Sequence, residues 1–363
     1  ANLSLNLSLS CILAIWKGIE EFGLTLLNTK YLLYLSKFCR FFASSSYLWP
    51  ENRKAMTHTE ITDRIKQLKK EKNAVILAHY YTRPEVQDIA DYLGDSLGLS
   101  QEAGKTKADI IVFCGVHFMA ETASIISPDK KVLIPAQHAG CSLAESLTGY
   151  ELREWKKANP EGIVVSYVNT TAEVKAWTDI CCTSANALKV VESLPENRKI
   201  LFVPDKNLGA WIQKKTGRAL ELWQGDCCVH ERITSEMILQ KSQEYPEADI
   251  LIHPESHCSH DDAILNLPQA YMYSTAGMIK HASHSSKKQF IIATEIETIY
   301  KLKKDNPTKE FIPIHPQTIC GQMKKVTLEN VWEALEKEQY EVKVPEAIRE
   351  KAKLPIERML KIN

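Results

Sequence analysis

The chain has 363 residues, which is enough for two or three domains of ordinary size. Its 45 basic and 45 acidic side chains cancel, and this balance excludes a basic field suited to nucleic acid or to an acidic membrane surface. No long apolar run is free of charge, and the motifs GxxxxGK(S/T) and GxGxxG are absent. We therefore expect a soluble protein without a membrane span and without a standard nucleotide-binding loop.

The ten cysteines are spread over the whole chain, unlike the dense disulfide framework of a small secreted domain. The first sixteen residues lack the positively charged start of a secretory signal. We therefore predict a cytoplasmic protein whose thiols are buried or bound to metal.

Residues 1–58 differ in composition from the rest and are predicted to form an N-terminal extension. They contain the apolar stretches CILAIW and YLLYLSKFCRFF, which are followed by FASSS and WPEN. One interpretation is a targeting helix or an amphipathic helix that lies on a surface. The other is an irregular or disordered segment outside the fold, and this is the interpretation that we adopt.

Strand-like and helix-like segments alternate from Thr59 onward, which is typical of α/β proteins. Three sets of strand-like runs recur at a spacing close to ninety residues. The sequence therefore predicts three copies of a βαβαβ-like unit, at residues 59–148, 149–232 and 233–345, before a C-terminal helix at 346–363. The first set of runs starts at Val75, Ile163 and Asp249, the second at Ala108, Lys199 and Gln289, and the third at Lys131, Ala219 and Glu310.

Polar residues follow the first strand of each unit. They are His79 in the first unit, Tyr167 and Asn169 in the second, and His253 and Glu255 in the third. Because ligands bind beyond the carboxyl ends of parallel strands, we expect these groups to face a common centre. A second polar pair follows 17–21 residues later in each unit, and its members are also well explained as helix N-caps. These pairs are Asp95-Ser96, Thr183-Ser184 and Ser274-Thr275.

A cysteine also follows the third strand of each unit. It is Cys141 in the first unit, Cys227 or Cys228 in the second, and Cys320 in the third, and the spacing does not decide between the two in the second unit. Three thiolates on a pseudo-threefold axis would suit an iron–sulfur cluster that leaves one iron without a protein ligand. They would equally suit a zinc ion with an open position.

The segment HPESHCSHDD at residues 253–262 has the composition of a separate metal site. His253, His257 and His260 would share one face of a helix, but Pro254 directly after a strand indicates a loop. A zinc site here is therefore only an alternative to the three cysteines.

Ten motifs in a fixed order carry a family resemblance. They are AVILAHYYTRPEVQDIADYLGDSL, FMAETA, YVNTTAEVKAWTD, CTSANA, PDKNLG, GDCCVH, ILIHPES, STAGM, ATE and ICGQMKK. Together they resemble the A-type quinolinate synthase family of NAD biosynthesis, over about residues 61–361. The resemblance implies three similar three-layer αβα domains around a pseudo-threefold centre, in agreement with the repeat.

The resemblance also implies a cofactor. This is a [4Fe–4S] cluster bound by Cys141, Cys227 and Cys320, and the family motif Gly-x-Cys-x-Val-His favours Cys227 over Cys228. An iron with an open position is a Lewis acid, which is what the removal of hydroxyl groups requires.

The resemblance further implies the residues of the active site. Tyr81, His253 and Glu255 are the implied catalytic residues, and their side chains are of types that transfer protons. The implied substrate-binding residues are His79, Ser96, Tyr167, Val168, Asn169, Ser184, His253, Pro254, Glu255 and Thr275.

The implied reaction is that of a transferase which joins iminoaspartate to dihydroxyacetone phosphate and releases phosphate and two waters to form quinolinate. The implied partners are these two substrates and the aspartate-oxidising enzyme that supplies iminoaspartate, with no nucleic acid and no membrane. Two alternatives stay open at this point: a cluster-dependent hydro-lyase without a phosphate pocket, and a non-enzymatic iron–sulfur or zinc sensor.

Overall fold

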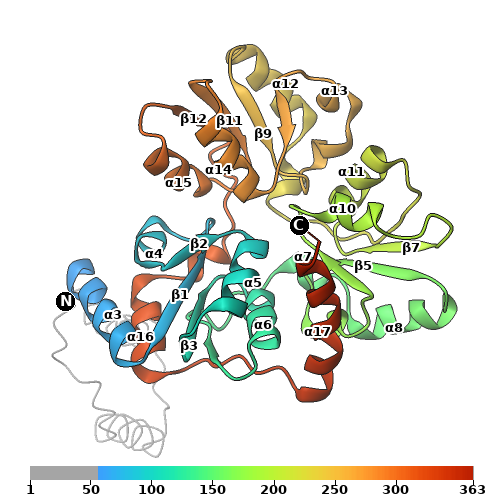
Figure 1. Cartoon of the computed structure of the whole chain (residues 1–363). Coiled ribbons are helices and arrows are strands. Elements are labelled where there is room, and N and C mark those ends of the chain that lie inside the picture. The colour runs from blue at the N-terminus through green and yellow to red at the C-terminus, as the bar shows by residue number, and fades with distance from the viewer. Residues whose placement is uncertain (1–55, 363) are drawn as a thin grey trace, which may run out of the picture. The chain divides into compact units, whose positions relative to one another are not determined.

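A computed structural model describes residues 56–362, and three parallel four-stranded sheets with flanking helices make up this part of the chain (Figure 1). The α/β class predicted from the repeat, with three similar three-layer units, is confirmed. The predicted N-terminal extension lies outside the described residues except for its last three. The exact limits of the three units stay a prediction.

The first sheet has the strand order β2-β1-β3-β4. Its strands are β1 (Ala74–His79), β2 (Tyr92–Gly94), β3 (Ile110–Cys114) and β4 (Lys131–Leu133). The helices of this region are α3 (His58–Glu71), α4 (Pro84–Ile89), α5 (Ser96–Lys105), α6 (His117–Ile126) and α7 (Ser142–Glu145).

The second sheet repeats this order as β6-β5-β7-β8. Its strands are β5 (Ile163–Tyr167), β6 (Ile180–Cys182), β7 (Ile200–Val203) and β8 (Glu221–Leu222). Its helices are α8 (Gly149–Ala158), α9 (Ala172–Lys175), α10 (Ala187–Glu192) and α11 (Lys206–Thr216), followed by the 3₁₀ helix η1 (His230–Arg232).

The third sheet has the equivalent order β10-β9-β11-β12. Its strands are β9 (Asp249–Ile252), β10 (Ala270–Met272), β11 (Gln289–Ala293) and β12 (Glu310–Pro313). Its helices are α12 (Ser235–Glu244), α13 (Asp262–Leu265), α14 (Thr275–His284) and α15 (Thr298–Asp305), with the 3₁₀ helices η2 (His257–His260) and η3 (Met323–Lys325).

Each sheet has one strand more than the repeat predicts. The extra strands β2, β6 and β10 are three residues long and form one edge of their sheets. Such short segments carry too few residues for an apolar period to be recognised. The central strands β1, β5, β9, β3, β7 and β11 are apolar and mostly buried, as expected for parallel strands covered on both faces.

The first two units share a polar contact between the residue before the edge strand and the central strand. Asp91 accepts a hydrogen bond of 2.8 Å from a backbone N–H of β1 and pairs with Lys69 at 2.6 Å. Asp179 accepts a hydrogen bond of 2.7 Å from the N–H of Val164 in β5 and pairs with Lys156 at 2.6 Å. The same residue types therefore fix the edge strands β2 and β6 to the central strand in both units.

Two helices follow the third sheet and return to the first two. Helix α16 (Leu328–Lys337) packs on α3, and α17 (Glu346–Leu360) packs on α9 and β6. The guanidinium of Arg358 donates to the carbonyl of Asp179 at 2.6 Å, and the amide of Asn186 donates to the carbonyl of Ile362 at 2.9 Å. The end of the chain thereby covers the edge of the second sheet.

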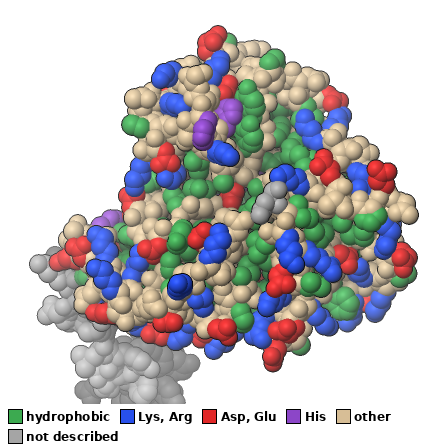
Figure 2. Space-filling view, viewed as in Figure 1, with side chains coloured by type: hydrophobic (Ala, Val, Ile, Leu, Met, Phe, Trp, Pro, Cys, Tyr) green, Lys and Arg blue, Asp and Glu red, His purple; other side chains and the backbone are tan. Residues whose placement is uncertain are grey.

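Basic and acidic side chains are mixed over the face drawn in Figure 2, with no continuous basic stripe. Across residues 56–362, no helix has both the length and the apolar character that a membrane span requires.

We expect Asp179→Ala to destabilise the fold, because the buried N–H of Val164 loses its acceptor and Lys156 loses its partner. The loss is about 1–3 kcal/mol, the usual cost of an unsatisfied buried donor. Thermal unfolding should therefore show a midpoint several degrees lower. Glu161→Ala is the control, since this side chain is 87% exposed and pairs only with Arg198 among the described residues. Equal midpoints for both variants would contradict this role of Asp179.

Candidate active site

A cavity of about 90 Å³ lies beyond the carboxyl ends of strands from all three sheets. Parallel strands end at the same edge of a sheet, so three such edges supply its polar lining. The residues inferred from the sequence that line this cavity are His79, Tyr81, Ser96, Cys141, Tyr167, Asn169, Ser184, Cys227, His253, Glu255, Thr275 and Cys320.

Two of the inferred binding residues do not line the cavity. Val168 and Pro254 each lie between two residues that do. The side chain of Val168 is buried in the hydrophobic core, and its carbonyl accepts a hydrogen bond of 2.8 Å from Lys175. A direct contact of these two side chains with a ligand in the cavity is therefore not supported.

The polar pairs of the repeat include residues that cap helices and residues that line the cavity. Asp95 caps α5 by accepting from the N–H of Gly98 at 3.1 Å, and Ser274 caps α14 by accepting from the N–H of Gly277 at 3.2 Å. In the second unit, Thr183 accepts from a backbone N–H two residues on, at 3.3 Å. The capping interpretation therefore holds for Asp95 and Ser274, whereas Thr183 caps no helix, since α10 begins after Asn186. The second members, Ser96, Ser184 and Thr275, line the cavity, and so do Asp95 and Thr183.

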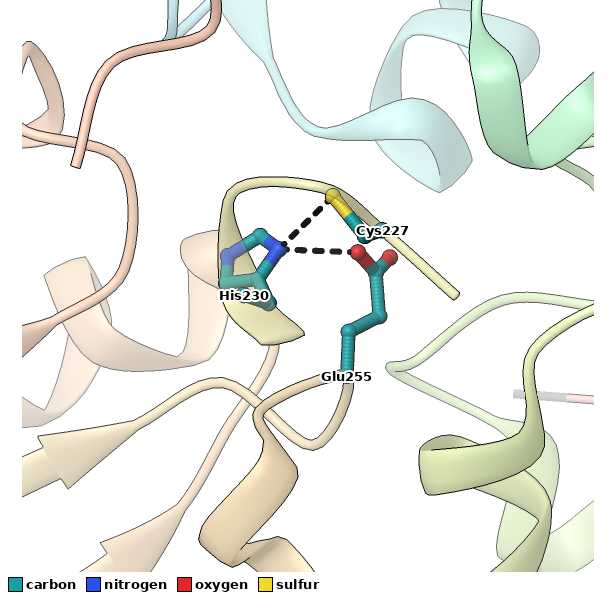
Figure 3. Close-up of side chains that lie close together, drawn as sticks. All are labelled: Cys227, His230 and Glu255. Atoms are coloured by element: carbon teal, nitrogen blue, oxygen red, sulfur yellow. Dashed lines mark hydrogen bonds and ion pairs between the residues drawn. The ribbon is translucent and has the colours of Figure 1, made fainter. Parts of the chain in front are cut away.

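Three side chains converge on one wall of the cavity (Figure 3). The Nδ1 atom of His230 lies 2.9 Å from Oε2 of Glu255 and 3.3 Å from Sγ of Cys227. The other carboxylate oxygen, Oε1, accepts a short hydrogen bond from the hydroxyl of Tyr167. Glu255, which follows β9 of the third unit, thus receives both of these hydrogen bonds from residues of the second unit.

The opposite nitrogen of His230 continues this set of hydrogen bonds toward Tyr81. Its Nε2 atom lies 2.8 Å from the hydroxyl of Thr294, which lies 2.7 Å from the hydroxyl of Tyr81. The Tyr81 hydroxyl is also 2.9 Å from that of Thr275. An ionised carboxylate only accepts hydrogen bonds, so a neutral His230 carries its proton on Nδ1 and accepts from Thr294. A continuous path of hydrogen bonds then joins Glu255 to Tyr81.

Burial governs the protonation of these groups. Burial lowers the pKa of His79 and of His253 to about 3, against the attraction of the Glu255 carboxylate. Burial and the charge of Glu255 raise the pKa of Tyr81 and of Tyr167 well above 10. Near neutral pH, His79 and His253 are therefore neutral and the two tyrosines keep their protons.

Glu255 behaves in the opposite way to an ordinary buried carboxyl group. Burial alone would raise its pKa, but the interactions with His253 and His230 and the hydrogen bonds from His230 and Tyr167 together lower it. With His253 neutral, the hydrogen bonds are what stabilise the carboxylate near pH 7. Glu255 is therefore an ionised acceptor in the lining of the cavity, held by hydrogen bonds from Tyr167 and His230.

Cys141, Cys227 and Cys320 share the same local geometry. Each precedes a short helix, and in each case the backbone N–H groups two and three residues on lower the pKa of the thiol. Burial outweighs these N–H groups and raises the pKa of all three thiols, that of Cys141 to about 12. All three are free cysteines. The repeat thus places three equivalent sulfur atoms on one cavity, each facing two amide donors.

Apart from the three cysteines, the described residues offer one other candidate metal site, and it is not the segment HPESHCSHDD that the sequence suggested. Cys227, His230 and Glu255 form the one group in residues 56–362 whose possible ligand atoms all lie within 4.8 Å of one another. The segment HPESHCSHDD provides no such group: Cys258 is buried in the core of the third sheet, and His257 lies 3.3 Å from Glu231. Its one member in the compact group is Glu255.

A buried lysine supports the loop that carries Asn169. The ammonium of Lys175 is fully buried and donates to the carbonyls of Val168 and Thr170, on either side of Asn169. The side-chain oxygen of Asn169 is buried without a hydrogen-bond partner and belongs to a residue that lines the cavity. An acceptor held in this way is available to a ligand that brings an N–H or O–H group.

The sequence reasoning did not single out His230, Thr294 or Lys175. His230 and Thr294 occur in GDCCVH and ATE, two of the ten motifs, so their presence was noted without a role. Their role depends on contacts between units that are far apart in the chain, and no local pattern reports these. Lys175 is the last residue of the short helix α9, where a lysine is usually exposed to solvent. Only the structure shows that it is buried and bonded to backbone carbonyls.

Comparisons with known proteins agree with the motifs. The family model described as "NadA: Quinolinate synthetase A protein" matches residues 63–361. The chain belongs to the quinolinate synthetase A family. The resemblance inferred from the ten motifs is thereby confirmed.

Relatives in this family match over nearly their whole length. The quinolinate synthase of Pyrobaculum aerophilum is 52% identical over 303 residues, which cover 82% of this chain and 98% of that protein. The quinolinate synthase of Thermus thermophilus is 48% identical over 302 residues, covering 83% and 97%. Quinolinate synthase 2 of Methanosarcina acetivorans is 48% identical over 316 residues, covering 86% and 99%.

The neutral state of His253 leads to a prediction for acid stability. The folded pKa is about 3 and the ordinary value is 6.5, so between these pH values the unfolded chain binds a proton that the folded chain does not. The free energy of unfolding should fall as the pH drops below 6.5, by up to about 1.4 kcal/mol per pH unit for this histidine. Urea unfolding of the chain without bound metal, between pH 7 and 5, measures this slope.

His253→Gln should reduce that slope, because the titrating group is gone. His257→Gln is the matched control in the same segment, since its side chain is 53% exposed and no large loss of solvent accompanies its folding. A slope unchanged in His253→Gln would show that His253 is not held neutral in the fold.

Proposed function

We propose that the protein is a quinolinate synthase of the transferase class that condenses iminoaspartate with dihydroxyacetone phosphate. One quinolinate, one phosphate and two waters leave for each pair of substrates. The observation that carries the proposal is the single cavity on which all three units place the polar residues and cysteines of the family motifs. An enzyme that oxidises aspartate would have to supply the unstable imine.

The proposed cofactor is a [4Fe–4S] cluster held by Cys141, Cys227 and Cys320. Three free thiols on one cavity, each with two amide N–H groups directed at its sulfur, suit a group that needs thiolate ligands. Cys227 has this geometry and is less exposed than Cys228, which supports Cys227 as the ligand. When bound, the cluster would supply a Lewis acid at an iron without a protein ligand.

A single zinc ion suits this arrangement less well. Zinc–sulfur bonds are about 2.3 Å long, so three sulfur atoms on one zinc lie within about 4.6 Å of one another. The three cysteines do not form a group with atoms within 4.8 Å, as Cys227, His230 and Glu255 do. The wider spacing favours a cofactor with several metal ions.

The residues around the cavity divide into proton carriers and binding groups. Glu255 is ionised and accepts protons, whereas Tyr81 is protonated and donates them. The path through Thr294 and His230 connects the two, so a proton taken up at one end can be returned at the other. Enamine formation and ring closure require proton removal and proton delivery at different carbon atoms, which such a path allows.

The binding groups are neutral donors and acceptors. Ser96, Ser184 and Thr275 present hydroxyl groups at the ends of three different units, and the Ser184 hydroxyl lies 3.3 Å from Nε2 of His253. Hydroxyl groups can bind the two carboxylates of iminoaspartate and the phosphate of the second substrate. The unpaired oxygen of Asn169 can accept from the imine N–H or from a substrate hydroxyl. Substrates with several anionic groups are therefore held by hydrogen bonds rather than by lysine or arginine.

Iron and acid-labile sulfide after strictly anaerobic purification test the cofactor. We expect about four of each per chain, as a [4Fe–4S] cluster requires. Cys141→Ala should lose the cluster and the activity. Cys258→Ala is the matched control, because this cysteine is buried away from the cavity, and it should retain both. Zinc without sulfide, or an iron-loaded and active Cys141→Ala variant, would contradict the assignment.

Tyr81→Phe tests the proton path without touching a cysteine. The variant removes the hydroxyl that contacts Thr275 and Thr294, and it should keep the iron of the parent. We expect kcat for quinolinate formation to fall by about 10²–10⁴, the usual contribution of general acid–base catalysis. Phosphate release and quinolinate are measured together. Full activity in this variant would exclude Tyr81 from the path.

A further inference from the structure

A buried ion pair next to the cavity has no part in the reaction as described so far. Glu295 follows β11 and is fully buried, and Lys324 belongs to η3, with 14% of its side chain exposed. The Nζ atom of Lys324 lies 2.6 Å from Oε1 of Glu295. An ion pair removed from water loses hydration, so it is retained only where hydrogen bonds satisfy both groups.

The carboxylate of Glu295 holds the loop of the third cysteine. Its Oε1 atom accepts a hydrogen bond of 3.1 Å from the backbone N–H of Cys320 itself, and its Oε2 atom accepts one of 2.8 Å from the N–H of Glu297. Cys141 is held differently: its N–H donates at 3.3 Å to Glu145, four residues on, in an exposed contact. The N–H of Cys320 is therefore bound by the buried carboxylate of Glu295 from another segment, whereas that of Cys141 is bound by an exposed carboxylate of its own segment.

The ammonium of Lys324 holds the loop of Tyr81. It donates to the backbone carbonyl of Tyr81 at 2.6 Å, while the guanidinium of Arg83 donates to the carbonyl of Lys324 at 2.8 Å. Tyr81 and Arg83 follow β1 in the first sheet, more than two hundred residues before Lys324. Both members of the ion pair therefore bond to backbone groups of residues that line or flank the cavity.

We propose that Glu295 and Lys324 are positioning residues that fix the Cys320 thiol and the Tyr81 side chain relative to each other. This inference rests on the proposed function, in which Cys320 binds the cluster and Tyr81 transfers a proton. The pair joins the cofactor ligand of the third unit to the proton donor of the first. Loss of either charge frees both loops.

The experiment compares anaerobically purified holoenzyme variants. Glu295→Gln keeps the shape and an acceptor for the N–H of Cys320 but removes the charge, and Lys324→Met removes the ammonium. Variants of residues that support a metal ligand typically lose 10–100-fold in metal affinity or activity. We expect each variant to release iron to a chelator at least about tenfold faster than the parent and to show a lower kcat per bound cluster.

The control is an ion pair of the same length on the surface. Lys304 and Asp88 also lie 2.6 Å apart, with side chains 57% and 44% exposed. Lys304→Met should leave iron release and kcat unchanged. Lys324→Arg should restore much of the parent behaviour because it keeps the charge and the donors. If Glu295→Gln fails to fold, the Lys324 variants decide the question alone.

A second comparison separates positioning from a general loss of stability. If Lys324 acts through Tyr81, Lys324→Met should lower kcat strongly in the parent and only slightly in the Tyr81→Phe background, because the group that it positions is already gone. Equal fold-losses in both backgrounds, or iron release like that of Lys304→Met, would overturn the inference.

The parent protein separates the two levels of the proposal. A parent that binds iron and forms quinolinate, with variants that behave like the control, would refute the positioning role alone. A parent without iron or without quinolinate would refute the proposed function, and the positioning role with it.

Discussion

The site depends on one topological constraint: parallel strands end together. Each of the three sheets gathers the carboxyl ends of its strands at one edge, and each edge faces the same cavity. A loop that follows a strand on any sheet therefore contributes to one site. This explains how residues as distant in sequence as Tyr81, Tyr167 and Glu255 come to line one cavity without any long excursion of the chain.

The carboxylate of Glu255 is at the centre of the hydrogen bonds on one wall of the cavity. Its hydrogen bonds from Tyr167 and His230 keep it ionised in spite of burial. Burial, together with the charge of Glu255, raises the pKa of Tyr81 and of Tyr167 and keeps both protonated. Burial also keeps His79 and His253 neutral, because it disfavours a positive charge even beside the carboxylate. Burial thus sets the protonation of these four side chains, whereas hydrogen bonds set that of Glu255.

The three-unit α/β architecture could be predicted from the sequence because strand-like runs recur at a spacing close to ninety residues. Each of the nine apolar runs that the repeat contains forms a strand, and the three runs of each unit lie in the same sheet. The strands β2, β6 and β10 were missed, because each has only three residues and no longer apolar run marks it. The strands β4 and β8 are no longer than these, but the longer runs KVLIPA and ALELWQ contain them. The family followed from ten ordered motifs, each weak alone.

Only part of the candidate site could be predicted from the sequence. Strand ends and the recurrent cysteines marked His79, Glu255 and Cys141 as residues of one centre, since these positions follow from topology. The contacts of His230 with Thr294 and of Lys324 with Tyr81 depend on how the units meet, which a single sequence does not encode locally. The side chain of Val168, directly after the end of β5, is buried in the core although its two neighbours line the cavity.

The equivalent surroundings of the three cysteines bear on how the protein is made. Each sulfur faces the N–H groups of residues two and three positions on, so the third position is complete only once Gln322 and Met323 have been added. All twelve strands of the three described sheets precede these two residues in the chain. A cofactor bound by all three thiols would therefore meet its complete set of ligands only after the residues of every sheet have been synthesised.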